Sequence, residues 1–298
     1  MRPSLRATWL ALGAIALWAT LAPVGVRLSH LPPFLTAGCA LLIGSLVALP
    51  WSGFQWRLAI VPAKTLALGI YGLFGYHFLL FLAFRTAPAV QANLVNYLWP
   101  LLIVVLAPLF HKHSRLHFRQ VIAALAGLTG AILVMTNGQA VSVDFNFGYL
   151  AALASAFIWA TYSLMTQRVG AFHTAAIGNF GFVSGILALL CHFMLETPVT
   201  LSLNDAGLLT WMGLGPLGLA FYLWDAALKN GNAQHIGLLS FLTPLCSTLL
   251  LLIDRQEALT NLVALAGLLI VGGAWFGRPH SATEAANDPQ FEIKSTHT

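Results

Sequence analysis

Ten long apolar segments, separated by short polar or turn-rich breaks, account for most of this chain. Each approaches the roughly 20 residues that an α-helix needs to cross a hydrocarbon layer about 30 Å thick. The pattern predicts an all-α polytopic membrane protein with ten transmembrane helices. The predicted helices lie near residues 7–26, 33–51, 65–84, 89–110, 120–136, 147–166, 174–195, 206–224, 233–253 and 258–276.

The two ends of the chain need separate interpretation. Arg2 and Arg6 precede the first apolar segment, as they would in a cleaved signal peptide. That segment is about 20 residues long, lacks a clean small-x-small cleavage site and has a counterpart later in the chain, so we interpret it as a retained helix. The polar segment 278–298 is expected to be a disordered cytoplasmic tail.

Short motifs from the first half of the chain recur in the second half at a nearly constant distance. LWATLAPVGVR at 17–27 resembles IWATYSLMTQR at 158–168, an offset of 141 residues. NYLWP at 96–100 resembles SFLTP at 240–244, an offset of 144 residues. Each match is weak, but a shared offset over several segments indicates an internal duplication.

The duplication divides the chain into a first five-helix repeat, 1–140, and a second, 141–277. Because each repeat holds an odd number of helices, the second copy begins on the opposite side of the membrane and is inverted. Inverted repeats are typical of secondary transporters, in which substrate binds near the middle of the membrane where the halves meet. Some channels share this architecture, so the symmetry alone leaves a pore as an alternative.

A polar stripe lies within the fourth predicted helix. Its residues are spaced i, i+3, i+4 and i+7, which places them on one helical face, with Trp99 beside them. They are Asn93, Asn96, Tyr97 and Pro100. An unpaired amide in hydrocarbon costs several kcal/mol, so this face must meet protein or a water-filled cavity. We interpret it as part of the lining of a central substrate cavity.

The ninth predicted helix carries the equivalent stripe, with Ser240, Phe241 and Pro244, and we expect it to face the same cavity. Pro100 and Pro244 each remove one backbone hydrogen bond, which permits a kink. A kinked helix can act as a hinge between inward-open and outward-open forms. The alternative is a static kink in a helix held by hydrogen bonds between amides.

Aromatic side chains in other predicted helices extend this cavity. Trp18 and Trp159 are counterparts in the two repeats and lie mid-helix, where an indole N–H needs a partner. Ser155 and Tyr162 share the helical face of Trp159. A cavity walled by Trp and Tyr suits flat, apolar or aromatic solutes, through stacking and through contact with cationic groups.

Tyr76 and His77 lie together in the third predicted helix. His77 could bind a substrate carboxylate when it is protonated, or relay protons. A histidine that only hydrogen-bonds to a neighbouring helix is an equally good interpretation. We include both residues among the candidates for substrate binding.

Composition and charge agree with a membrane protein and set its orientation. Hydrophobic residues make up 58% of the chain and charged residues 8%, and the mean hydropathy is +0.81. A soluble domain of this length could not bury so much apolar surface. With the N-terminus in the cytoplasm, only Arg27, Arg85 and Arg255 of the 14 Lys and Arg residues fall in outer segments. The positive-inside rule therefore places both termini in the cytoplasm. The basic residues are spread over loops, which argues against nucleic-acid binding.

Other kinds of chemistry are not indicated. Cys39, Cys191 and Cys246 fall within predicted helices without the spacing of a disulfide framework or a metal site, and we expect no metal or cofactor. GLGPLG at 213–218 matches a dinucleotide-binding motif but lies inside an apolar helix, where small residues serve helix packing. No Asp or Glu lies mid-helix, since Asp225 maps to an inner helix end. Facilitated transport is therefore simpler than ion coupling.

Four motifs carry a resemblance to a known family. They are VNYLWP at 95–100, AFIWATYS at 156–163, WDAALKNGN at 224–232 and SFLTPLCS at 240–247. They are similar to motifs of the YddG-type aromatic amino acid exporters, in the EamA group of the drug/metabolite transporter (DMT) superfamily. The resemblance covers about residues 7 to 277. It implies inverted five-helix repeats and export of aromatic and other neutral amino acids from the bacterial cytoplasm across the inner membrane by alternating access.

The resemblance also implies roles for individual residues. The positions that match the family are Trp18, Tyr76, Asn96, Tyr97, Trp99, Pro100, Trp159 and Tyr162. Relatives can carry an acidic residue where this chain has His77. That departure leaves the charge preference for substrate, and any role in proton movement, open at this position.

The expected partners are an amino acid substrate and membrane lipid, with no obligate protein partner. One alternative is another metabolite or drug exporter of the superfamily, such as a lipid or nucleotide-sugar carrier, which would need Lys or Arg in the cavity to bind phosphate. A second alternative is an intramembrane lipid-modifying enzyme. It would need a nucleophile–base pair or a metal set, and the sequence has no H-E-x-x-H motif or mid-helix carboxylate pair. We therefore expect a transporter and not an enzyme.

Overall fold

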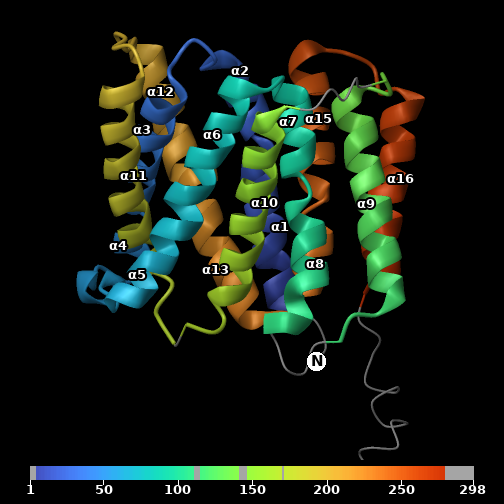
Figure 1. Ribbon diagram of the computed structural model, residues 1–298, viewed down its shortest axis with the longest axis horizontal. Helices are drawn as coiled ribbons and strands as arrows, with labels where there is room; N and C mark the ends of the chain where they lie inside the picture. The colour runs from blue at the N-terminus through green and yellow to red at the C-terminus, as the bar shows by residue number, and fades with distance from the viewer. Residues whose placement is uncertain (1–4, 111–114, 141–145, 170, 279–298) are drawn as a thin grey trace, which may run out of the picture.

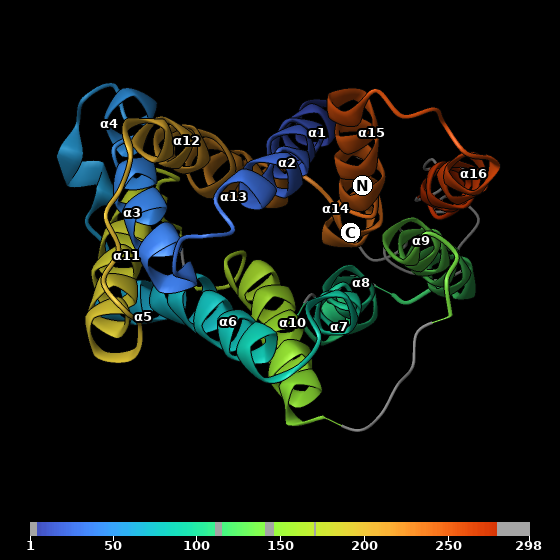
Figure 2. The ribbon, with the colours of Figure 1, turned by 90° about the horizontal axis from the view of Figure 1, so that it is seen from above.

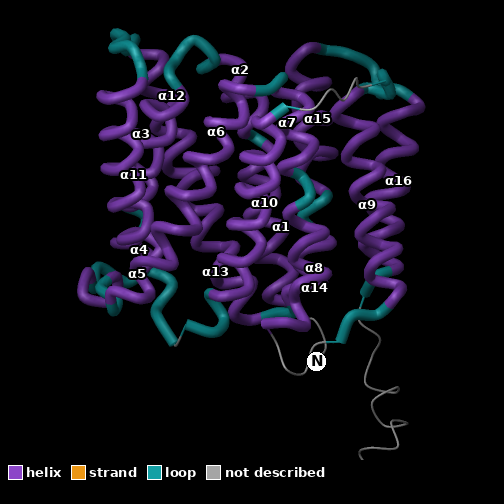
Figure 3. Tube along the Cα trace, in the orientation of Figure 1, coloured by secondary structure: helices purple, strands orange, loops and turns teal. Residues whose placement is uncertain are grey.

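A computed structural model describes residues 5–110, 115–140, 146–169 and 171–278. The described residues form helices joined by loops and contain no strand (Figure 3). The helices stand side by side along a common direction (Figure 1). Among the described residues, nine helical runs of 19 to 28 residues are long and apolar enough to cross a membrane, and a tenth apolar helix, α16, has 16 residues. The prediction of an all-α polytopic membrane protein is confirmed.

Several of the ten runs consist of two or three helical pieces in line. The first five runs are α1 (Leu5–Ala19) with α2 (Leu21–Arg27), α3 (Pro33–Ser45) with α4 (Ala48–Trp51), α5 (Ala63–Ile70) with η2 (Tyr71–Gly75) and α6 (Tyr76–Thr86), α7 (Ala89–Asn96) with α8 (Trp99–Phe110), and α9 (Phe118–Thr136). The other five are α10 (Phe147–Met165), α11 (Ala176–Leu195), α12 (Leu203–Leu214) with η3 (Gly215–Leu219) and α13 (Ala220–Asn230), α14 (Ala233–Leu239) with α15 (Leu242–Arg255), and α16 (Asn261–Phe276). A short 3₁₀ helix, η1 (Trp56–Ala59), follows α4.

The eighth run differs most from its prediction. The sequence predicts a helix over 206–224, and the structure extends it from Leu203 to Asn230. The predicted end was set by the charge of Asp225 and Lys229, yet both residues lie inside α13. They remain helical because the two side chains neutralise each other within the helix, with Lys229 Nζ 2.6 Å from Asp225 Oδ2.

Two helical runs are interrupted just before a proline. The break between α7 and α8 falls at residues 97–98, shortly before Pro100, and the break between α14 and α15 falls at 240–241, shortly before Pro244. A proline lacks the N–H that would bond to the carbonyl four residues earlier, and its ring clashes with that carbonyl. Helix interruptions are therefore present next to both prolines, and whether the runs bend there during transport stays a prediction.

The third and eighth runs each contain a π-helical segment. These segments, η2 (Tyr71–Gly75) and η3 (Gly215–Leu219), begin 144 residues apart, the same offset that relates the NYLWP and SFLTP motifs. A π-helical turn widens the backbone, costs helix stability and is frequent at functional sites. Its recurrence at this offset supports the internal duplication.

The principal helix contacts join the two halves of the chain. α3 packs against α11, α9 against α16, α1 against α13, and α6 against α10 (Figure 2). Small residues allow this close approach: a Cβ added at Gly185 would lie 3.0 Å from the carbonyl oxygen of Gly38, and one added at Gly130 would lie 2.8 Å from that of Ala266. Interhelical packing on small residues is typical of membrane proteins. The core of the molecule is thus shared between residues 1–140 and 141–277.

Candidate functional site

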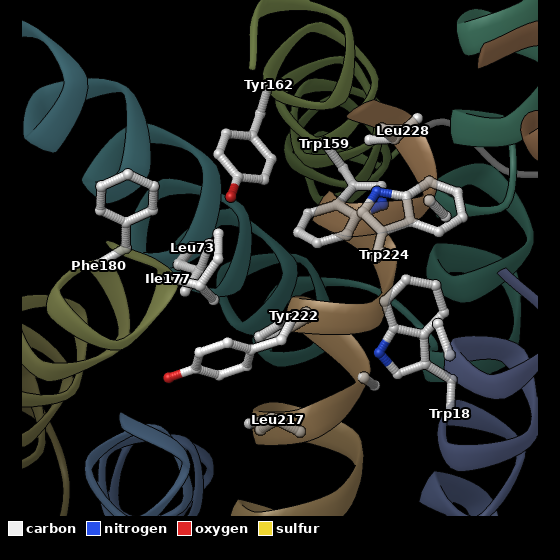
Figure 4. Packing of buried hydrophobic residues seen from close by; sticks show 14 of the residues in the cluster. Trp18, Leu73, Trp159, Tyr162, Ile177, Phe180, Leu217, Tyr222, Trp224 and Leu228 are labelled. Atoms are coloured by element: carbon white, nitrogen blue, oxygen red, sulfur yellow. The ribbon is translucent and has the colours of Figure 1, made fainter. Parts of the chain in front are cut away.

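Four tryptophans from four different helical runs meet in the core. Trp18 of α1, Trp99 of α8, Trp159 of α10 and Trp224 of α13 form what we call the tryptophan cluster, and Figure 4 shows three of its members converging. All six pairs of rings have centroids 5.1–6.4 Å apart. Each side chain is at most 7% exposed. Aromatic rings at these separations attract one another beyond the effect of burial alone.

Helix interruptions place two members of the cluster. Trp18 lies in the last turn of α1, next to the break at Thr20, and Trp99 begins α8 directly after the break at 97–98. The Trp18 indole N–H donates to the carbonyl oxygen of Pro216, within the π-helical segment η3, at 3.1 Å. The Trp224 indole N–H donates to Ser163 Oγ at 3.1 Å. These bonds satisfy two polar groups that burial would otherwise leave without a partner.

A second layer of rings surrounds the tryptophan cluster. Phe221 lies 5.5 Å from Trp159 and 6.1 Å from Trp18, and Tyr76 lies 5.2 Å from Trp159. The His77 ring contacts Tyr76 at 5.1 Å and Phe221 at 6.3 Å. The structure therefore brings the two candidate residues of the third run against aromatic residues of the sixth and eighth runs.

His77 is oriented by its own helix. Its Nδ1 lies 2.6 Å from the carbonyl oxygen of Leu73. A carbonyl oxygen only accepts, so Nδ1 carries the hydrogen, and the other ring nitrogen of the neutral side chain is an acceptor. The side chain is 8% exposed. A neutral His77 can therefore accept a hydrogen bond from a donor that reaches the cluster.

The polar stripe of the fourth run faces protein at Asn96. Its Oδ1 accepts from Ser155 Oγ of α10 at 2.9 Å, and its Nδ2 donates to Tyr76 Oη of α6 at 3.2 Å. This polar chain joins three runs beside the tryptophan cluster. Asn93 and Tyr97, on the same face of the fourth run, are half-buried. The amide of Asn96 is thus satisfied without lipid or solvent in this conformation.

Tyr162 lies against the tryptophan cluster because a glycine leaves it room. Its ring is 5.5 Å from that of Trp159. A Cβ added at Gly72, in the π-helical segment η2, would lie 2.2 Å from the Tyr162 ring. Any residue larger than glycine at this position would displace the tyrosine. The sixth and third runs are therefore fitted to each other at this point.

The equivalent stripe of the ninth run behaves differently. Ser240 Oγ donates to the carbonyl oxygen of Gly237 in its own helix at 2.6 Å. Phe241 packs in a separate apolar cluster with Val104 and Ile270, and its ring lies over Gly127 of α9. The structure does not bring Phe241 beside the tryptophan cluster in this conformation. Ser240 and Phe241 are both fully buried.

Two members of the site were missed by the sequence reasoning, Trp224 and Phe221. The predicted helix ended at residue 224, so Trp224 had the position of an aromatic residue at the membrane surface. Trp224 was nevertheless the first residue of the WDAALKNGN motif. A neutral Asp225–Lys229 pair, spaced i and i+4, was the signal that the helix continues past both residues.

The cluster is closed in this conformation, since the rings fill the space between them. A cavity of about 390 Å³ lies elsewhere, between α7, α9 and α10. Its lining includes Leu94, Ile132 and Tyr149, and none of its lining residues belongs to the tryptophan cluster. A flat solute that bound at the cluster would have to separate the rings, and it would meet aromatic faces together with the polar groups of Asn96 and His77.

Comparison with known proteins gives the chain its family. The model of the EamA-like transporter family matches residues 5–136 and again 146–277. The aromatic amino acid exporter YddG of Ancylobacter novellus is 37% identical over 274 residues, which cover 90% of this chain and 95% of that protein. The threonine/homoserine exporter RhtA of Escherichia coli is 30% identical, over 78% of this chain and 72% of that protein.

A solved crystal structure has the same fold. It is 36% identical in sequence and superposes with a TM-score of 0.84, covering 91% of this chain and 96% of the other. The family match extends over both halves of the membrane-spanning part. This chain belongs to the EamA-like transporter family.

Proposed function

We propose that this protein exports aromatic and other neutral amino acids from the bacterial cytoplasm by alternating access, moving them down their gradient. The observation that carries the proposal is the tryptophan cluster, built from both halves of the chain and bordered by Asn96 and His77. The similarity to an aromatic amino acid exporter supports the same substrate class.

The cluster offers both parts of such a substrate a partner. The substrate ring would insert between the indoles of Trp159 and Trp224, which are stacked at an interplanar angle of 26°. Its backbone groups would bond to the amides of Asn93 and Asn96 and to His77. Tyr76, Tyr97, Trp18, Trp99, Ser155 and Tyr162 complete the proposed site. Substrate binding would exchange contacts between protein rings for equivalent contacts with the solute.

Opening the cluster requires helices that bend. The breaks before Pro100 and Pro244 and the π-helical segments η2 and η3 are the weak points of the runs that border it. Backbone at such points lacks regular hydrogen bonds, so bending costs little. We assign the two prolines the role of hinges between the inward-open and outward-open forms.

We further propose that the chain comprises two inverted five-helix repeats, 1–140 and 141–277, in the inner membrane with both termini in the cytoplasm. The equal spacing of the π-helical segments and the packing of α1 against α13 and of α6 against α10 support the inversion. The positive-inside rule supports the orientation.

A nucleotide-sugar or lipid carrier is a weaker candidate. Such a protein needs cationic side chains that contact phosphate. The ring contacts around the cluster in the described residues involve Trp, Tyr, Phe and His, with no Lys or Arg among them. A neutral, ring-lined site favours a neutral substrate with a flat apolar part.

Flux measured in proteoliposomes tests the proposal. Purified protein should release preloaded tryptophan and phenylalanine faster than protein-free liposomes do, and should not release a nucleotide sugar. Trp159→Ala should lower tryptophan flux by about tenfold or more, since loss of a buried aromatic contact costs on the order of 1.4 kcal/mol.

Trp275→Ala is the matched control, because Trp275 lies on α16 and is 67% exposed. This variant should transport at the rate of the unmodified protein. Equal flux for Trp159→Ala and Trp275→Ala would reject the site, and absence of amino acid flux in the unmodified protein would reject the function.

A further inference from the structure

A buried pair of opposite charges lies beside the tryptophan cluster, in α13. Asp225 directly follows Trp224, and its side chain is 2% exposed. Asp225 Oδ2 lies 2.6 Å from Lys229 Nζ and accepts from Thr174 Oγ1 at 2.7 Å. Asp225 is also within electrostatic range of Tyr162, which contacts Trp159. The pair therefore adjoins the proposed substrate site on the side of Phe172 and Thr174, which precede α11.

The two carboxylate oxygens of Asp225 are not equally used. Asp225 Oδ1 is buried and has no hydrogen-bond partner among the described residues. A buried acceptor on a charged group is costly to leave unsatisfied, and the cost is larger than for a neutral group. Ionisable residues inside membrane-spanning helices are rare and mark functional sites. Among the described residues, Asp225 Oδ1 is thus an acceptor available to a donor that reaches it.

Lys229 provides the positive charge of the pair, next to the negative charge of Asp225. Its ammonium donates to the carbonyl oxygen of Phe172 at 2.9 Å and, more weakly, to Thr174 Oγ1 at 3.4 Å, and it lies 3.6 Å from the centre of the Phe172 ring. The Lys229 side chain is 23% exposed and that of Asp225 is 2% exposed, so Lys229 is the more accessible member of the pair. The long contact with Thr174 is one that a stronger acceptor can replace.

We propose that Asp225 and Lys229 together recognise the charged groups of a zwitterionic α-amino acid as it enters from the cytoplasm. Asp225 Oδ1 accepts from the substrate ammonium, and the Lys229 ammonium donates to the substrate carboxylate. The inference rests on the proposed function and adds a charged recognition element to the uncharged polar partners that border the tryptophan cluster. The pair has no net charge, so a zwitterion is favoured over a cation or an anion.

A carboxylate at the other end of the molecule shows what a purely structural pair looks like. Glu196 is paired with His192, also at i and i+4, and its side chain is 6% exposed. Its Oε1 accepts from the Phe34 N–H at 3.0 Å, and its Oε2 accepts from the Leu35 N–H at 3.2 Å. Both oxygens are bonded to protein, including the N-terminus of α3, where an anion is stabilised. Neither oxygen of Glu196 is left without a partner.

Three ligands that share an indole ring test the proposal. They are tryptophan, tryptamine, which lacks the carboxylate, and indole-3-propionate, which lacks the ammonium. The apparent Kd of each for the full-length protein is measured from the rise in Tm with ligand concentration. The unmodified protein should bind tryptophan most tightly.

Asp225→Asn should raise the apparent Kd of tryptophan and of tryptamine by about 10-fold to 100-fold and leave that of indole-3-propionate unchanged. The loss of one hydrogen bond to a charged group changes a binding constant by roughly this factor. Lys229→Met keeps an apolar side chain against Phe172. It should raise the apparent Kd of tryptophan and of indole-3-propionate but not that of tryptamine. A Glu196→Gln control should lower the Tm of the protein and leave the ratios of the three Kd values unchanged.

If Asp225→Asn raises the apparent Kd of all three ligands equally, or of none of them, the inference is overturned. The pair would then serve only to hold α13 against Phe172 and Thr174. If tryptophan fails to bind or move through the unmodified protein, the proposed function fails instead. The two failures are distinguished by the unmodified protein alone.

Discussion

Asn96 shows how a strongly polar side chain is accommodated inside a membrane-spanning run. Both ends of its amide are bonded to side chains of other runs, Ser155 and Tyr76, and it is 3% exposed. The sequence identified Asn96 by its position in a helical stripe and required a partner for it, which the structure supplies. Which side chains would serve as partners was not predictable, because that depends on how three runs are rotated against one another.

Removal of one partner should be costly at this position. Ser155→Ala leaves the Asn96 Oδ1 acceptor buried without a donor, so we expect a loss of about 1–3 kcal/mol in the free energy of unfolding. The change is measured as a lower Tm and a lower denaturant midpoint in detergent. Thr129→Ala is the control, since Thr129 is exposed and donates only to the Leu125 carbonyl in its own helix. Similar Tm values for the two variants would contradict the assignment.

Other residues of the site show where single-sequence reasoning stops. Trp18, Trp99, Trp159, Tyr76 and His77 were all named from position and pattern, and the structure brings them together. Phe241 was named by symmetry with the polar stripe, yet its ring lies over Gly127 in a different cluster. The proposed symmetry between the two halves accounts for a helix break before each proline, but the side chains at the equivalent positions have different surroundings.

At the scale of the element, apolar length predicted the helical runs to within a few residues. For nine of the ten runs, the charged or turn-rich breaks in the sequence predicted both ends to within about three residues. The eighth run was the exception, because a pair of opposite charges extends it to Asn230. The breaks before Pro100 and Pro244 follow from the chemistry of proline. The π-helical segments did not follow from the sequence, since glycines inside an apolar run are equally compatible with a regular helix and with a widened one.

The two prolines should affect transport more than stability. Pro100→Ala or Pro244→Ala restores a backbone N–H and a regular helix, so the run becomes straighter and stiffer. We expect Tm to be unchanged or higher and the rate of tryptophan efflux to fall several-fold. Pro108→Ala is the control, because Pro108 also lies inside α8 but away from the break. Equal efflux from all three variants would show that the breaks are static.

At the scale of the whole molecule, the two ends of the bundle differ in charge. Arg27, Arg85 and Arg255 lie at one end, and Arg27 is paired there with Asp254 at 2.6 Å. Among the described residues, the opposite end carries Arg57, Lys64 and most of the other basic side chains. This bias was read from the sequence and is the basis for placing the termini in the cytoplasm.

Labelling from one side tests the orientation. In a variant whose three cysteines are replaced by alanine, Gln256→Cys should react with a membrane-impermeant maleimide in cells whose cytoplasmic membrane is intact. Gln55→Cys, at the opposite end, should react only after that membrane is permeabilised. Both positions are exposed, so accessibility to solvent is matched. The reverse pattern would invert the topology and make the Asp225–Lys229 pair an external one.

The pairing of helices across the two halves has a consequence for biogenesis. During synthesis, α1, α3, α6 and α9 are all made before α10, α11, α13 and α16, which are their principal neighbours. Each of these N-terminal helices therefore lacks its principal partner until the matching helix of the second half is made, and α9 lacks α16 until the final helix is complete. A chain arrested after α9 lacks all four of these pairings.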